Sequence, residues 1–135
     1  MVELKAYKIN KLELENKVQN GTQLKLNNQT KYNVNYIDGE NVCIGNLEFR
    51  IVEENQNPFE IRIEMVAQFT YAPGDDKAEI HTQSFDQLFP FLRQIVHTTT
   101  SFTGMPGLMI PMMKLNPETV RVNKKNDEEE SSPLN

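Results

Sequence analysis

One stretch of the chain, residues 84–113, constrains the fold most, because it contains the only long helical pattern in the sequence. Side chains recur there at the three-and-four spacing that lines one face of an α-helix. They are Phe85, Leu88, Phe89, Leu92, Ile95, Val96, Thr99 and Phe102. Ser84 and Gln87 predict a capping box at the start of the helix, and Gly104 followed by Pro106 predicts its end.

Prolines divide this stretch. Pro90 lies inside the helical pattern, where it lacks an N–H donor and clashes with the preceding turn, so we expect a kink or a fresh helix start there. Beyond the helix, residues 105–113 contain four methionines, Leu108 and Ile110 between prolines. This composition predicts an extended apolar segment rather than a continued helix.

Most of the chain before the helix alternates between apolar and polar residues, which is typical of half-buried β-strands. In residues 2–16 the apolar phase changes twice, and each change requires an inserted residue, so we expect one long strand with bulges. Further strands are predicted near 24–36, 42–51 and 59–71. The first strand presents apolar residues on both phases, which is unusual for the edge strand of a monomer. We therefore expect a second subunit to cover its spare face.

The strand pairing can also be predicted. Asp38 and Gly39 indicate a hairpin with a loop over 38–40, in which the apolar residues of 34–36 share a face with Val42 and Ile44. The apolar phase then moves to odd numbers, which predicts a bulge at 45–46.

Charge favours one register in the next hairpin. We expect Arg50 opposite Glu64, because the alternative pairs Arg50 with Arg62 and Glu48 with Glu64, and like charges across a ladder are unfavourable. The sheet and the helix each need an apolar partner layer. The predicted architecture is α+β with two layers, a four-stranded antiparallel sheet covered by one main kinked helix. Residues 1–122 form this single domain, and the acidic residues 123–135 form a disordered tail.

Composition excludes several classes of function. No apolar run approaches the ~20 residues that cross a bilayer, and the N-terminal residues lack a signal-peptide core, so we expect a cytoplasmic protein without membrane insertion. A lone cysteine, Cys43, excludes an internal disulfide and a multi-cysteine metal site. The net charge of −5, with scattered Lys and Arg, argues against nucleic acid as a partner.

Catalytic chemistry finds no support either. His81 and His97 have no carboxylate or cysteine at ligand spacing, and neither Cys43 nor the run of hydroxyls at 98–101 has a basic partner. We therefore expect that the protein is not an enzyme and that it has no catalytic residue, no metal and no cofactor.

Within the predicted helix, the block LFPF at 88–91 is followed by Arg93, then by Gly104 and Pro106, and then by the apolar run LMIP at 108–111. This series resembles the export chaperone SecB, and more closely a short SecB-like relative. The resemblance implies a four-stranded antiparallel sheet with a crossover between the first two strands. It also implies a homodimer, or a homotetramer built from two dimers, with the first strand and main helix at the interfaces.

SecB holds unfolded preproteins on apolar grooves and passes them to a translocase motor. Residues 112–125 contain Pro117, so the long C-terminal helix of that family should be absent or reduced to a turn. The tail contains neither Cys nor His and therefore cannot be the zinc-binding tail that contacts the motor. The resemblance thus implies client handling without the standard export hand-off.

Two hypotheses follow. A SecB-like, ATP-independent chaperone or adaptor would bind unfolded or extended polypeptide, because unbranched methionines adapt to varied partners. The candidate client-binding residues are Met105, Leu108, Met109, Ile110, Met112 and Met113. Alternatively, the same segment covers the core edge or an interface in an oligomeric structural or regulatory protein that binds one protein partner or none. The candidate oligomer-interface residues under either hypothesis are Leu4, Tyr7, Ile9 and Leu12.

Overall fold

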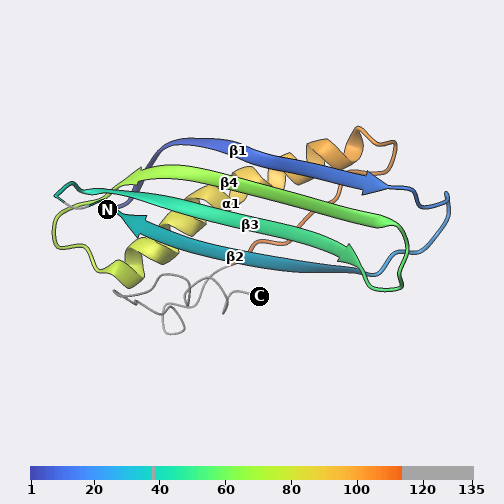
Figure 1. The fold of residues 1–135 in the computed structure, drawn as a ribbon, viewed down its shortest axis with the longest axis horizontal. Coiled ribbons are helices and arrows are strands. Elements are labelled where there is room, and N and C mark those ends of the chain that lie inside the picture. Colours follow the sequence, from blue (N-terminus) through green and yellow to red (C-terminus); the bar gives the residue numbers. More distant parts are fainter. Residues whose placement is uncertain (38, 114–135) are drawn as a thin grey trace.

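A computed structural model of the protein describes residues 1–37 and 39–113. It contains four strands and one helix: β1 (Glu3–Asn16), β2 (Leu26–Tyr36), β3 (Val42–Glu53), β4 (Phe59–Thr70) and α1 (Lys77–Ser101). The strands form one antiparallel sheet in the order β1-β4-β3-β2, so the chain crosses over between β1 and β2 (Figure 1). The expected sheet and crossover are confirmed. The predicted tail at 123–135 and the expected reduction of a C-terminal helix beyond residue 113 lie outside the described residues.

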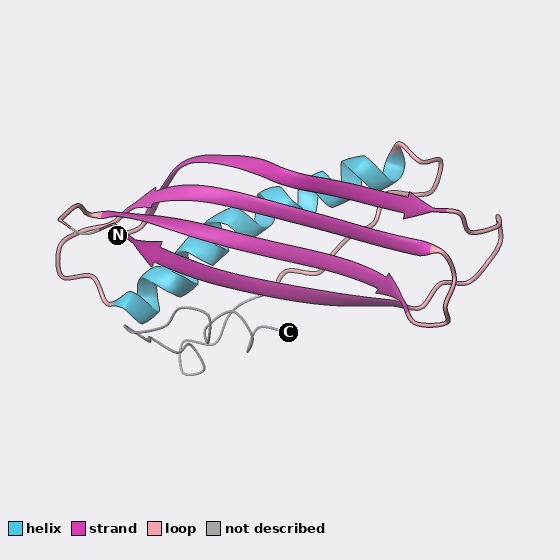
Figure 2. Ribbon diagram, viewed as in Figure 1, coloured by secondary structure: helices cyan, strands magenta, loops and turns pink. Residues whose placement is uncertain are grey.

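The helix packs on one face of the sheet, which we call the inner face, and crosses the strands diagonally (Figure 2). Side chains from β2, β3, β4 and α1 fill the core between the two layers, because each strand turns alternate residues inward. The predicted two-layer α+β architecture is therefore confirmed.

Strand β1 contains the two expected bulges, between Leu4 and Ala6 and between Ile9 and Lys11. They have a consequence that the sequence reading missed. Because each bulge reverses the facing of the residues after it, Leu4, Tyr7, Ile9 and Leu12 all pair with inner-face residues of β4. The predicted spare apolar face on β1 is therefore wrong. Its large apolar residues lie on the same side of the sheet as α1.

The β2–β3 pairing differs from the prediction. Tyr36 pairs with Cys43 and Val34 with Gly45, so β3 turns odd-numbered residues inward along its whole length and has no bulge at 45–46. The reason is steric. A Cβ at Gly45 would lie 2.5 Å from Tyr32 Oη, so this glycine provides space for a buried tyrosine rather than a break in the strand.

The charge-based register of β3 and β4 is also wrong, because Arg50 pairs with Arg62 and Glu48 with Glu64. Glu60 resolves the conflict: its Oε2 accepts from Nε of both arginines at 2.9 Å. A second carboxylate, Glu53, accepts N–H groups of the following turn at 2.7 and 2.9 Å. The turn therefore helps to set the register, and a shared carboxylate neutralises the arginine pair.

Helix α1 begins earlier than predicted. Asp76 is the N-cap and accepts from Glu79 N–H at 3.4 Å, whereas Ser84 is buried inside the helix. Ile80 extends the apolar face by one turn, so the Ser84 capping box was the wrong start signal. The helix then continues through Pro90 to Ser101, without a fresh start. Pro90 lies on the exposed side, where water can satisfy the carbonyl that loses its partner.

Candidate functional site

Residues 105–113, which we call the strap, return from the end of α1 along the inner side of the sheet (Figure 1). Side chains at three positions on one side of α1 hold the strap backbone. Leu108 N–H donates to Thr100 Oγ1 at 2.8 Å, and Arg93 Nε donates to the Ile110 carbonyl at 2.6 Å. Next to the first of these bonds, Gly107 lies so close to the His97 ring that a Cβ there would approach Nε2 to 2.6 Å.

The six predicted client-binding residues lie together in the strap but divide into two groups. Ile110 is buried, with 4% of its surface exposed, and Met105, Leu108 and Met113 are half-buried against the core. Met109 is 74% exposed, and Met112 is also exposed. The strap therefore covers part of the core with one set of side chains and presents two methionines to the outside.

A shallow hollow lies between the strap and α1. Its lining is mostly apolar and is formed by Pro90, Arg93, Gln94, His97, Met109 and Ile110. The Arg93 guanidinium is fixed at its edge, because Nη1 also contacts Met112 Sδ at 2.9 Å. One outward methionine thus lines the hollow, and the other is held beside it.

The predicted interface residues of β1 flank the other side of α1. Leu4 is half-buried near the start of β1. Its N–H donates to Gln87 Oε1 of α1 at 2.8 Å, which holds this end of the strand on the helix. Tyr7, Ile9 and Leu12 are 39% to 44% exposed, although they face the helix layer. Tyr7 packs on Phe91 with 4.9 Å between ring centroids. We call Tyr7, Ile9, Leu12 and Phe91 the open flank.

The sequence reading missed several of these residues as parts of a surface. Phe91 is 37% exposed, and Phe102 at the helix C-cap is 82% exposed. Arg93, His97 and Thr100 hold the strap, and their spacing of four and three residues was available as a signal for one side of the helix. The spacing does not show what this side of the helix contacts, which is the backbone of residues 107–110.

Three polar side chains, Tyr32, His81 and Ser84, are buried in the core. Tyr32 Oη donates to Ser84 Oγ at 2.6 Å, and the His81 ring packs edge-on to Tyr32. Burial lowers the pKa of His81 to about 4 and raises the pKa of the Cys43 thiol to about 11, so both groups are neutral near pH 7. Within residues 1–37 and 39–113, no group of three His, Cys, Asp or Glu side chains is placed to hold a metal.

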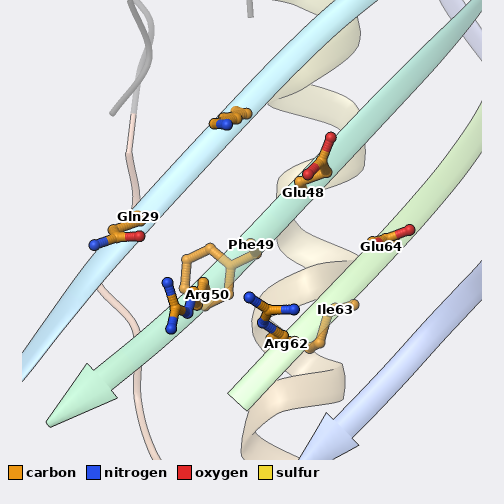
Figure 3. Close-up of a pocket in the computed structure, with 8 residues that line it drawn as sticks. Gln29, Glu48, Phe49, Arg50, Arg62, Ile63 and Glu64 are labelled. Atoms are coloured by element: carbon orange, nitrogen blue, oxygen red, sulfur yellow. The ribbon is translucent and has the colours of Figure 1, made fainter. Parts of the chain in front are cut away.

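The opposite, outer face of the sheet is charged. A shallow pocket there is lined by side chains of β2, β3 and β4, including Gln29, Glu48, Arg50, Arg62 and Glu64 (Figure 3). The hydrogen bond from Arg50 holds the pKa of the nearby Glu60 carboxyl below its usual range. No helix in the described part of the chain has the length and apolar character needed to span a membrane.

No family model matches the chain, and no curated protein matches it in sequence. In structure, it is similar to a SecB-like chaperone from Mycobacterium tuberculosis that was solved in complex with a ChAD peptide from an antitoxin. The TM-score is 0.70 at 15% identity, over 83% of this chain and 90% of that one. It is also similar to a protein of unknown function from Streptococcus agalactiae, with a TM-score of 0.51 at 17% identity, over 83% and 98% of the two chains. The chain has a SecB-like fold.

Proposed function

We propose that this protein is a SecB-like, ATP-independent chaperone or adaptor that binds unfolded or extended polypeptide at the strap and the hollow beside it. The observation that carries the proposal is the outward placement of Met109 and Met112 on a strap whose backbone is held by Arg93 and Thr100. Large apolar side chains exposed together on a held backbone form a binding surface that does not have to be ordered when a client arrives.

The chemistry of the surface suits varied clients. A methionine side chain has three rotatable bonds and a polarizable sulfur, so two of them can repack around differently shaped apolar residues. The hollow beside them supplies an apolar floor with one cation, Arg93, at its edge. The solved SecB-like neighbour holds a peptide from another protein, which supports a peptide as the class of ligand.

The test is direct binding of several unrelated, fluorescently labelled unfolded peptides. We expect micromolar affinity for the wild-type protein and a loss of about 30-fold to 900-fold for Met109→Asp with Met112→Asp, because each methionine contributes roughly 1–2 kcal/mol of apolar burial. Ile37→Asp is the matched control, since Ile37 is a partly exposed apolar residue at the β2–β3 hairpin. A wild-type protein that binds none of the peptides and does not slow client aggregation contradicts the proposal.

A second candidate is an oligomeric structural or regulatory protein with the same fold. The observation that favours it is the buried Ile110, because a strap that closes its own core has less apolar surface to offer. This candidate predicts that an apolar dye does not bind the native protein and that the protein still forms a homodimer or homotetramer through the open flank. Strong dye binding by the native oligomer would contradict it.

A further inference from the structure

The outer face of the sheet carries charged side chains in rows that run across the strands. From β1 through β4 and β3 to β2, one row consists of Lys11, Glu64, Glu48 and Lys31. The next row, two residues along each strand, consists of Glu13, Arg62, Arg50 and Gln29. On β1, β4 and β3 the sign of the charge reverses from one row to the next. Figure 3 shows Glu48 and Arg50 on β3 beside Glu64 and Arg62 on β4.

These charges are incompletely matched within the chain. Arg50 and Arg62 share the single carboxylate of Glu60. Glu48 and Glu64 lie opposite each other, and neither forms an ion pair with any residue in 1–37 or 39–113. Two like charges at adjacent strand positions repel each other. The face therefore holds two carboxylates that form no ion pair, with Lys11 and Lys31 on the strands to either side, next to two guanidiniums that share one carboxylate.

We propose that this outer face binds the outer face of a second copy of the chain about a two-fold axis that runs across the strands between the two rows. Such an axis places each row over the other row of the second copy, so the contact is isologous. Glu64 of one copy then faces Arg62 of the other, and Glu48 faces Arg50. In the next rows outward the match extends along β1, where Lys8 faces Glu15, while Val66 faces Glu60 on β4.

The charge balance and the size of the face agree with this partner. Five basic and five acidic side chains lie on the four rows: Lys8, Lys11, Lys31, Arg50, Arg62, Glu13, Glu15, Glu48, Glu60 and Glu64. The face is thus neutral on a chain whose net charge is −5, and two copies repel each other least here. Strand spacing and rise give roughly 500 Å² per copy over these rows, or about 1,000 Å² in total, the lower limit for a specific interface.

Salt screens the attraction between opposite charges on the two copies, which makes the association salt-dependent. Sedimentation velocity of the wild-type protein should therefore give a higher mass at about 0.01 M salt than at about 1 M salt, where the Debye length falls from about 30 Å to about 3 Å. Contact through the apolar open flank is not weakened by salt, so it does not explain such a fall. An equal mass at both salt concentrations would overturn the proposal.

Charge reversal gives the sharper test. The variants Glu48→Arg with Glu64→Arg and Arg50→Glu with Arg62→Glu should each show the high-salt mass even at low salt. An equimolar mixture should regain the larger species, with at least tenfold tighter association than either variant alone. Glu40→Arg with Glu54→Arg, in turns outside the face, makes the same change of net charge as the first variant and should behave as wild type.

Thermal melts establish that each variant folds. A folded pair that does not associate on mixing overturns the proposal. If the arginine variant does not fold, the glutamate variant still decides, because retention of the wild-type mass at low salt would also overturn it.

Discussion

The two halves of α1 cover the sheet in different ways. The first half, residues 77–89, packs directly on the sheet with a stacked pair of buried aromatics, Phe85 and Phe89, whose ring centroids are 5.0 Å apart. The second half, residues 90–101, buries fewer side chains, namely Leu92, Val96 and Thr100. One of its sides is closed by the strap, and the other is the open flank.

This difference separates folding from association. A single helix such as α1 can cover only part of the inner face, and its diagonal course leaves one region on each side of its second half. The strap closes one region from within the same chain. The open flank has the same apolar character without a covering segment among the described residues, so its most economical cover is another protein surface.

The largest effect should come from the first half. Phe85→Ala removes a fully buried ring and should lower the free energy of unfolding by about 3–5 kcal/mol, as measured by urea denaturation. Phe91→Ala is the matched control in the second half, and we expect a loss below about 1 kcal/mol because that ring is partly exposed. Equal losses would contradict the contrast between the halves.

The strap should rank next. Ile110→Ala leaves a cavity beneath the strap and should cost about 2–4 kcal/mol in the same assay. Met109→Ala, one position earlier, should cost less than about 0.5 kcal/mol because its side chain faces water. If both substitutions are neutral, the strap does not contribute to the core.

The pH dependence of stability reports on the first half. Burial lowers the pKa of His81 to about 4, against 6.5 for an exposed histidine. Between about pH 6.5 and pH 4, the unfolded chain therefore binds a proton at His81 that the folded chain does not bind. The stability that is fully present above pH 6.5 should fall by about 2 kcal/mol by pH 5. Urea denaturation of wild type and His81→Gln at pH 7 and pH 5 checks this, and identical decreases would remove His81 as the cause.

The smallest effect on stability should come from the open flank. Leu12→Glu changes a partly exposed residue and should alter the free energy of unfolding of the monomer by less than about 0.5 kcal/mol. Its effect should appear in light scattering instead, as a halved native mass if the open flank is a dimer interface. Lys17→Glu, an exposed change beyond the end of β1, is the control and should keep the wild-type mass.

Local patterns predicted most of the fold. The phase changes of β1 announced both bulges, because each depends only on neighbouring residues. The predicted registers of β2 with β3 and of β3 with β4 were wrong for a different reason. They depend on contacts between distant residues, such as the space that Tyr32 requires over Gly45 and the carboxylate that Glu60 shares between two arginines.

The candidate site was predictable to a similar depth. Methionines between prolines predicted an extended apolar segment at residues 105–113. Which side chains turn outward depends on hydrogen bonds from Arg93 and Thr100, which act across 17 and 8 residues and leave no periodic trace. The open flank was misplaced because the two bulges act together to bring Tyr7 and Leu12 to one face.

The position of the strap in the chain also bears on its synthesis. Residues 105–113 follow every other described element, and a growing chain emerges from its N-terminus at about 5–20 residues per second. The strands and the helix therefore leave the ribosome before the segment that closes the sheet beside them. During that interval the nascent protein exposes the kind of apolar surface that we propose its mature form recognises in others.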